Sequence, residues 1–255
     1  MTTIPQSLSR EAWKGQEFNT FTVIGLCKRT GAYGVCLASS PLTVASRCPY
    51  IEGGLGAVST QSFTNPVLGP ILLDLLRHGY TAQQAIDAVR VRDEFFEWRQ
   101  IGIVTRTGDV AVHSGQKGKD YTGHIVGDGF LCMGNTIVGH QVIAAMAKAF
   151  EENADELLEE RLMRALEAGG EAGGEAKGQL SAGIMVADDS QLRPRTNLRI
   201  EMANPTPPEG GNAIRDLRRV VDAFKPMIKY YQVWHTNPLM ENWRDWKGEL
   251  PDSTR

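Results

Sequence analysis

Polar and apolar positions alternate along several short stretches of the chain, and this period of two is typical of β-strands. The first stretch begins at Thr20, where two β-rich runs flank the turn-like sequence KRTGAYG, so residues 20–40 are predicted to form a hairpin. Residues 99–115 are predicted to form a second hairpin around RTGD. Single strands are predicted in LGAVSTQSF, HIVGDGFLCMGN and LSAGIMVAD.

Apolar residues recur every three or four positions between these strands, which predicts helices. TNPVLGPILLDLLRHGYTAQQAIDAVRV carries this period twice, and Thr81 followed by Gln84 is a capping-box spacing that marks a second helix start. A break is predicted near Asn153–Ala154 in the next helical segment, and Pro226 interrupts the last one. Hairpins that alternate with helix pairs indicate an α+β fold with helices packed on antiparallel sheets.

The patterned region is predicted to be one domain over residues 20–225. Residues 1–19 form a polar leader without strand or helix periodicity and are interpreted as a possible propeptide. Residues 226–255 hold three of the five tryptophans, so they are interpreted as a docking or interface tail, and a homo-oligomer is expected. The alternative that this tail only covers the core remains open.

Composition and charge remove several classes of function. A net charge of −3 and an isoelectric point near 6.0 give no basic face for nucleic acid. No stretch has the about 20 apolar residues that span a bilayer, and the N-terminal residues lack the features of a secretory signal. The four cysteines show no metal-site or disulfide spacing. We therefore expect a cytoplasmic protein without metal, cofactor, nucleic-acid or membrane partners.

Thr20 follows the leader directly and is the candidate nucleophile. A threonine hydroxyl needs a base, and the α-amine of an N-terminal threonine can supply it because its pKa is about 8. Attack of the Thr20 hydroxyl on the Asn19 carbonyl would release residues 1–19 and unmask that amine. The competing interpretation is that Thr20 merely opens a strand, where threonine is common.

Several blocks in order resemble the DUF1028 family, whose members have the N-terminal nucleophile (Ntn) hydrolase fold: TFTVIGLCKRTGAYGVCLASS, GGLGAVSTQSFTNPVLGPILLDLLRHGYTAQQAI, RQIGIVTRTGDVAVHSG, GHIVGDGFLCMGN and QLSAGIMV. The resemblance implies a four-layer αββα sandwich with Thr20 facing the cleft between the sheets, and hydrolysis of an amide-like bond. Some members are described as peptidoglycan-binding. Three departures are the leader in place of a Met-Thr start, Leu180 at a position that is often polar, and the tail after about residue 225.

The polar residues of these blocks are the candidate site. Asn135 is expected to stabilise the oxyanion, with Gln61 and Asn65 as further donors, although each amide could instead stabilise a turn. The remaining candidates are Ser39 and Ser40, which could hold the Thr20 amine, Ser114 at the cleft, and Arg99, which could bind a substrate carboxylate or pair with Asp93 or Glu97.

Three histidines, His113, His124 and His140, have no ligand or triad spacing and are interpreted as structural or exposed. The predicted function is hydrolysis of a C–N bond in a small amide, lactam or ureido compound, with Thr20 as nucleophile. One alternative is a non-catalytic ligand- or peptidoglycan-binding protein that keeps its leader, in which the Thr20 nitrogen has no lone pair to act as base. Another is an enzyme that recruits a different base.

Overall fold

The computed structural model describes residues 19–118, 121–189, 193–234, 237, 239 and 242–245. Its strands form two sheets in which every pair is antiparallel, so the predicted α+β class is confirmed. The six-stranded sheet has the order β10-β9-β2-β1-β8-β7, with bounds β1 (Thr20–Leu26), β2 (Tyr33–Ser39), β7 (Tyr121–Gly127), β8 (Phe130–Ile137), β9 (Ser181–Ala187) and β10 (Thr196–Ile200). The four-stranded sheet has the order β3-β4-β5-β6, with bounds β3 (Pro49–Glu52), β4 (Gly56–Ser62), β5 (Arg99–Thr105) and β6 (Val110–Ser114).

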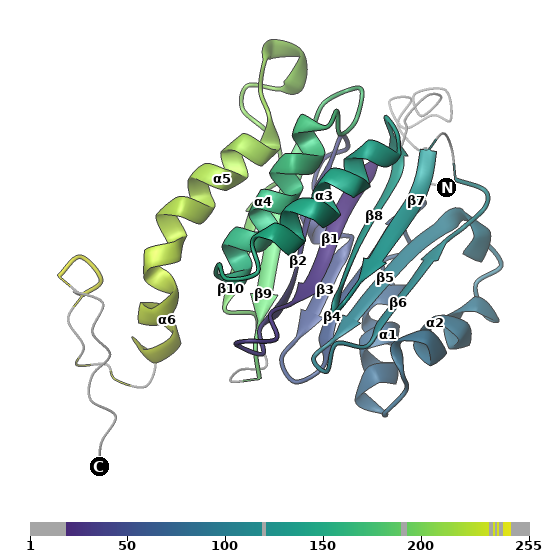
Figure 1. Cartoon of the computed structure of the whole chain (residues 1–255), viewed down its shortest axis with the longest axis horizontal. Coiled ribbons are helices and arrows are strands. Elements are labelled where there is room, and N and C mark those ends of the chain that lie inside the picture. The colour runs from purple at the N-terminus through teal and green to yellow at the C-terminus, as the bar shows by residue number, and fades with distance from the viewer. Residues whose placement is uncertain are drawn as a thin grey trace, which may run out of the picture.

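Helices cover the two sheets separately (Figure 1). The four-stranded sheet contacts α1 (Leu68–Arg77) and α2 (Ala82–Arg90), whose apolar faces share one buried cluster with it. The six-stranded sheet contacts α3 (His140–Glu152), α4 (Leu158–Glu171) and α5 (Ala213–Phe224). After α5, Pro226 lies in a short 3-10 turn, and the chain continues as α6 (Ile228–Trp234).

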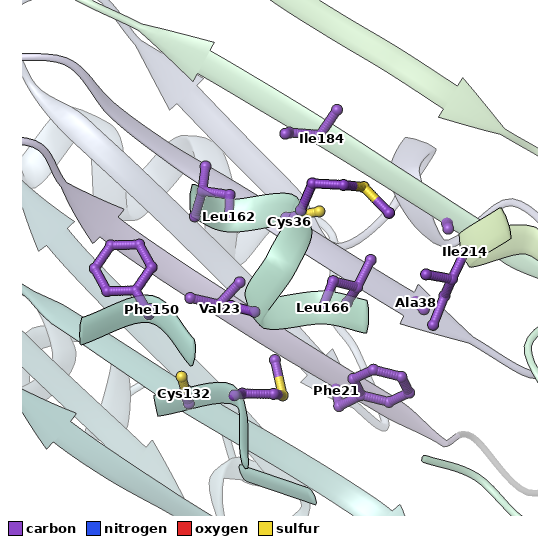
Figure 2. Close-up of a cluster of buried hydrophobic side chains, with 14 of the residues drawn as sticks. Phe21, Val23, Cys36, Ala38, Cys132, Phe150, Leu162, Leu166, Ile184 and Ile214 are labelled. Atoms are coloured by element: carbon purple, nitrogen blue, oxygen red, sulfur yellow. The ribbon is translucent and has the colours of Figure 1, made fainter. Parts of the chain in front are cut away.

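Strand β1 shows why its side chains divide between two environments. Successive side chains of a strand point to opposite faces. Phe21 and Val23 belong to the cluster under α3 and α4, which Figure 2 shows. Ile24 and Leu26 belong to a different apolar cluster, formed where the two sheets contact each other. Thr20 is in phase with Ile24 and Leu26, so the alternation directs it to the space between the sheets.

Most predicted elements are confirmed, and three details differ. The capping box at Thr81 is present, and the helical segment is broken where it was predicted, between the end of α3 and the start of α4. HIVGDGFLCMGN is a tight hairpin of β7 and β8 rather than one strand, because Asp128 and Gly129 turn the chain and Gly129 takes a positive φ of 75°. The short strands β3 and β10 were not predicted.

The leader lies outside the described residues except for Asn19, and the tail is described only in part. All four cysteines are buried and unpaired by disulfides. Within the described part of the chain, no helix combines the length and apolar character needed to cross a bilayer.

Candidate functional site around Thr20

Thr20 begins the central strand β1 and is buried together with the peptide bond that precedes it. Asn19 is 2 % exposed and Thr20 is 4 % exposed. Thr20 pairs with Asn135 on β8, and Phe21 pairs with Ala38 on β2, so Ser39 lies beside Thr20 on its other flank. The Thr20 Oγ1 and Ser39 Oγ atoms are 3.1 Å apart. The sheet register therefore gathers three of the predicted residues at one strand end.

The carbonyl oxygen of Asn19 is the focus of these hydroxyls. Thr20 Oγ1 donates to it at 2.5 Å, and Ser39 Oγ also donates to it. The 3.1 Å separation of the two hydroxyl oxygens allows a second proton arrangement, in which Thr20 donates to Ser39 and Ser39 donates to the carbonyl. In that arrangement a lone pair of Thr20 is free beside the Asn19 carbonyl, and Ser39 polarises the carbonyl oxygen.

A pair of buried glutamines faces Thr20 from the four-stranded sheet. Gln61 on β4 and Gln100 on β5 are register partners, and neither is exposed. Gln61 Nε2 donates to the Thr20 carbonyl at 3.2 Å, to Gln100 Oε1 at 2.7 Å and to Asn135 Oδ1 at 3.3 Å. Gln61 Oε1 accepts from Thr22 Oγ1 at 2.5 Å. These neutral groups link both sheets around the Thr20 carbonyl.

The hydrogen-bond chain continues from Gln100 towards the surface. Gln100 Nε2 donates to Ser114 Oγ at 2.8 Å, and Ser114 Oγ lies 2.9 Å from Nδ1 of His124. Burial lowers the pKa of His124, and the neighbouring His113 lowers it further. A neutral imidazole can accept the Ser114 proton through Nδ1, which fixes the direction of this end of the chain.

Glu175 is a buried carboxyl near the same strand ends, on the side of the helices. The residue is 3 % exposed, and neither carboxyl oxygen has a hydrogen-bond partner among the described residues. Burial raises its pKa well above the ordinary value, and the nearby hydroxyl and backbone N–H of Ser40 lower it only in part. Ser40, which was predicted to hold the Thr20 amine, thus lies beside Glu175.

Two other predicted residues serve different parts of the fold. Asn65 Oδ1 accepts from the backbone N–H of Val67 at the start of α1 and lines a cavity of about 490 Å³ between α1 and α2. Arg99 pairs with Asp93 at 2.9 Å and donates to the Phe63 carbonyl, so the predicted alternative of pairing with Asp93 is what the structure shows. Both side chains are used locally rather than around Thr20.

The other histidines also make local contacts. His113 stacks on Phe96 with ring centroids 3.9 Å apart, and His140 Nδ1 lies 2.9 Å from the Tyr121 hydroxyl. No three His, Cys, Asp or Glu side chains converge as a metal site within the described ranges.

Thr22, Gln100 and Glu175 were not among the predicted site residues. Thr22 repeats the polar character of Thr20 two positions later in an otherwise apolar strand, so it lies on the same face. Gln100 is the polar neighbour of Arg99 at the start of a strand of apolar residues. The sequence therefore contained a signal for both. Glu175 lies in a glycine-rich segment with no periodicity, which gave none.

Fold and site together define a two-sheet α+β protein in which a buried strand-end threonine hydroxyl contacts the carbonyl of its own preceding peptide bond. The chain belongs to the DUF1028 family, because the model of that family, described as "Family of unknown function (DUF1028)", matches residues 20–209. The match begins at Thr20, the first residue of β1.

A solved structure of the same family is similar over nearly the whole chain. It is the crystal structure of protein SPO2555 from Silicibacter pomeroyi, which is 25 % identical with a TM-score of 0.70, covering 91 % of this chain and 95 % of that one. No curated protein matches the chain.

Proposed function

We propose that this protein is an Ntn-type hydrolase with the four-layer αββα architecture of that superfamily, and that it cleaves the C–N bond of a small amide, lactam or ureido compound. The observation that carries the proposal is the 2.5 Å contact between Thr20 Oγ1 and the Asn19 carbonyl oxygen, together with the Ser39 hydroxyl on that same oxygen. Helices on the outer faces of two contacting sheets agree with this architecture.

Release of the leader would be the first reaction. The Thr20 oxygen attacks the Asn19 carbonyl carbon, and its proton passes to the Thr20 nitrogen as the C–N bond breaks. The product is an ester between Asn19 and the Thr20 oxygen, with a free amine on Thr20. Water then cleaves this ester and leaves a carboxylate on residue 19. Ser39 supports the step because its hydroxyl donates to the oxygen on which negative charge develops.

Turnover of substrate would repeat the same chemistry with an external carbonyl. The Thr20 amine takes the hydroxyl proton, the oxygen attacks, and the proton moves to the leaving nitrogen. Water then attacks the acyl-enzyme ester and restores the hydroxyl. Gln61 has a positioning role, because it holds the Thr20 carbonyl and accepts from Thr22, and Asn135 flanks Thr20 in the next strand.

Intact-mass measurement of the purified full chain tests the proposal. We expect loss of residues 1–19 in the unaltered protein, retention in Thr20→Ala, and slowed loss in Ser39→Ala. Thr43→Ala is a suitable control, because Thr43 is a hydroxyl residue in the segment after β2 and outside the Thr20 network. A panel of amides, lactams and ureido compounds is then screened for released amine.

A retained leader in a folded protein that binds a ligand without turnover would favour a non-catalytic binding protein. Cleavage that persists in Thr20→Ala would show that another protease removes the leader. Either result contradicts the proposed chemistry.

A further inference from the structure

Asn19 indicates what the acyl part of a substrate looks like, provided that the proposed function holds. In leader release, the group esterified to Thr20 Oγ1 is the acyl group of Asn19. In turnover, the acyl group of the substrate is esterified to the same oxygen. Both acyl groups must therefore fit the same surroundings, and Asn19 is a built-in substrate analogue.

The surroundings of the Asn19 side chain follow from the register of β1 and β2. Phe21 and Ala38 are the last pair of this antiparallel ladder, and extending its register by two residues on each strand would set Asn19 opposite Ser40. Opposed residues point to the same face, with Cβ atoms about 5 Å apart. Phe21 and Ala38 both lie in the cluster under the helices, as Figure 2 shows, so Asn19 and Ser40 continue that face.

Glu175 approaches this face from the segment between α4 and β9. A Cβ atom on the preceding Gly174 would lie 3.4 Å from the Phe21 ring, which places the segment against the start of β1. The Glu175 carboxyl lies near the hydroxyl and backbone N–H of Ser40 without a hydrogen bond of normal geometry. Asn19, Ser40 and Glu175 thus lie at the same end of the six-stranded sheet.

Two of these side chains have buried, unused hydrogen-bonding capacity. Asn19 Oδ1 and both carboxyl oxygens of Glu175 are buried and have no hydrogen-bond partner in the part of the chain that the structure describes. A buried polar atom without a partner is costly, so a site that keeps several of them is suited to a ligand that supplies the missing bonds. A neutral carboxyl group has one O–H donor and further acceptor lone pairs, and a primary carboxamide or ureido group offers both an acceptor oxygen and N–H donors in a compact, neutral form.

We propose that Ser40 and Glu175 form a subsite for the acyl side of the substrate, which selects acyl groups carrying a carboxamide or ureido group about two carbons from the scissile carbonyl. Departure of Asn19 empties this subsite, and an N–H group of the substrate then donates to Glu175. The burial that favours the neutral acid of Glu175 also disfavours an acyl group with a carboxylate at that position, and an apolar acyl group leaves the Glu175 carboxyl unpartnered.

Three anilides of nearly the same shape test this selectivity: the 4-nitroanilides of asparagine, leucine and aspartate. With the processed enzyme, we expect kcat/KM for the asparaginyl compound to exceed that for the leucyl compound at least tenfold, with the aspartyl compound slowest. Glu175→Gln removes the second carboxyl group, with which a substrate carboxylate could not be ionised at the same time, and should raise the aspartyl-to-asparaginyl ratio at least tenfold. Glu171→Gln, an exposed position at the end of α4, is the matched control and should leave the ratio unchanged.

A thermal double-mutant cycle tests the contact without turnover. In Thr20→Ala, which keeps the leader, Asn19→Asp should lower the unfolding midpoint by placing two carboxyl groups together, and Glu175→Gln should recover part of that loss. Additive shifts would overturn the inferred contact. Hydrolysis with unchanged ratios in Glu175→Gln would overturn the subsite alone. Non-additive shifts of the unfolding midpoint without hydrolysis of any anilide would overturn the proposed function and its selectivity. Only the contact between Asn19 and Glu175 would then stand.

Discussion

The space between the two sheets is apolar at one end and polar at the other, although the same strands line both. At the apolar end, β1 and β8 contribute Ile24, Leu26, Leu131 and Met133, all buried in one cluster. At the polar end, the same two strands contribute Thr20, Thr22 and Asn135, which face the glutamine pair, Gln61 and Gln100.

The difference distinguishes the end that contributes most to the stability of the fold from the end that the proposed chemistry uses. Apolar burial contributes about 25 cal/mol per Å², whereas a buried polar group gains little beyond the hydrogen bonds it recovers. The polar end recovers them through amides and hydroxyls, and the hydrogen bonds among its described residues involve no carboxylate or guanidinium. Stability alone would be served as well by apolar residues there, so the polar end agrees with the chemical role proposed for it.

The largest effect on stability is expected from truncation at the apolar end. Leu131→Ala removes a fully buried side chain whose methyl groups lie against Gly102 on the opposite sheet. We expect a loss of about 2–5 kcal/mol in the free energy of unfolding, measured by urea denaturation. Val126→Ala on β7 is the control, since Val126 is 50 % exposed and its truncation should cost less than about 0.5 kcal/mol. Equal losses in the two variants would contradict the assignment of the core.

Acid unfolding should separate the neutral polar end from the charged network outside the sheets. Burial raises the pKa of Glu160 on α4, but hydrogen bonds from Arg218, Lys225 and Arg164 outweigh it and lower the pKa to about 2. Its folded-state pKa lies below the ordinary value of 4.5, so its contribution is complete above pH 4.5 and is lost as the pH falls towards 2.

That contribution is on the order of 3 kcal/mol at most, because one pKa unit corresponds to about 1.4 kcal/mol. Glu160→Gln should flatten the fall of the unfolding free energy over this pH window. Gln61→Leu should leave the slope unchanged, because amides do not titrate there. A Gln61→Leu slope as flat as that of Glu160→Gln would contradict this separation.

The sequence predicts strands and helices better than it predicts which strands meet. Alternation and the Thr81 capping box sufficed for the first two hairpins and for α2, because these signals are local. The β7–β8 hairpin was missed because its two-residue turn interrupts a continuous run of strand-forming residues. Strands β3 and β10 have only four and five residues, and neither was assigned to a hairpin by its turn residues.

Site residues were predictable one at a time but not as a group. Thr20, Ser39, Gln61 and Asn135 were predicted separately, partly from the family resemblance. These four residues come together through the register of β1 with β2 and β8 and through the contact between the sheets. Local periodicity predicts neither of these features. Glu175 depends on the same long-range packing, so no motif identified it.

Breaking the glutamine pair should cost less stability than Leu131→Ala. Gln61→Leu leaves the Thr22 hydroxyl and Gln100 Oε1 without their partner, which costs about 1–3 kcal/mol. Combined with Gln100→Leu, it should show a coupling of about 0.5–3 kcal/mol by urea denaturation, because the two amides share a hydrogen bond. Both variants should also slow leader release. Additive losses would mean that the two side chains do not act as a unit.

The smallest effect is expected at Glu175, on the helix side of the same strand ends. Its pKa is shifted in the opposite direction from that of Glu160. Burial raises the pKa of Glu175, so the folded state favours its neutral acid. Its contribution to the free energy of unfolding is therefore complete below about pH 4.5 and declines as the pH rises. Glutamine has nearly the same shape and stays neutral. Glu175→Gln in Thr20→Ala should therefore stabilise the leader-attached chain by about 1 kcal/mol at pH 7, or roughly 2–4 °C in the unfolding midpoint. This gain should shrink towards pH 4.5, and the exposed control Glu171→Gln should show no such trend. A difference in unfolding free energy that stays the same at every pH would mean that the buried Glu175 carboxyl does not destabilise this end of the sheet. The contrast between the two ends would then depend on the neutral hydrogen-bond network alone.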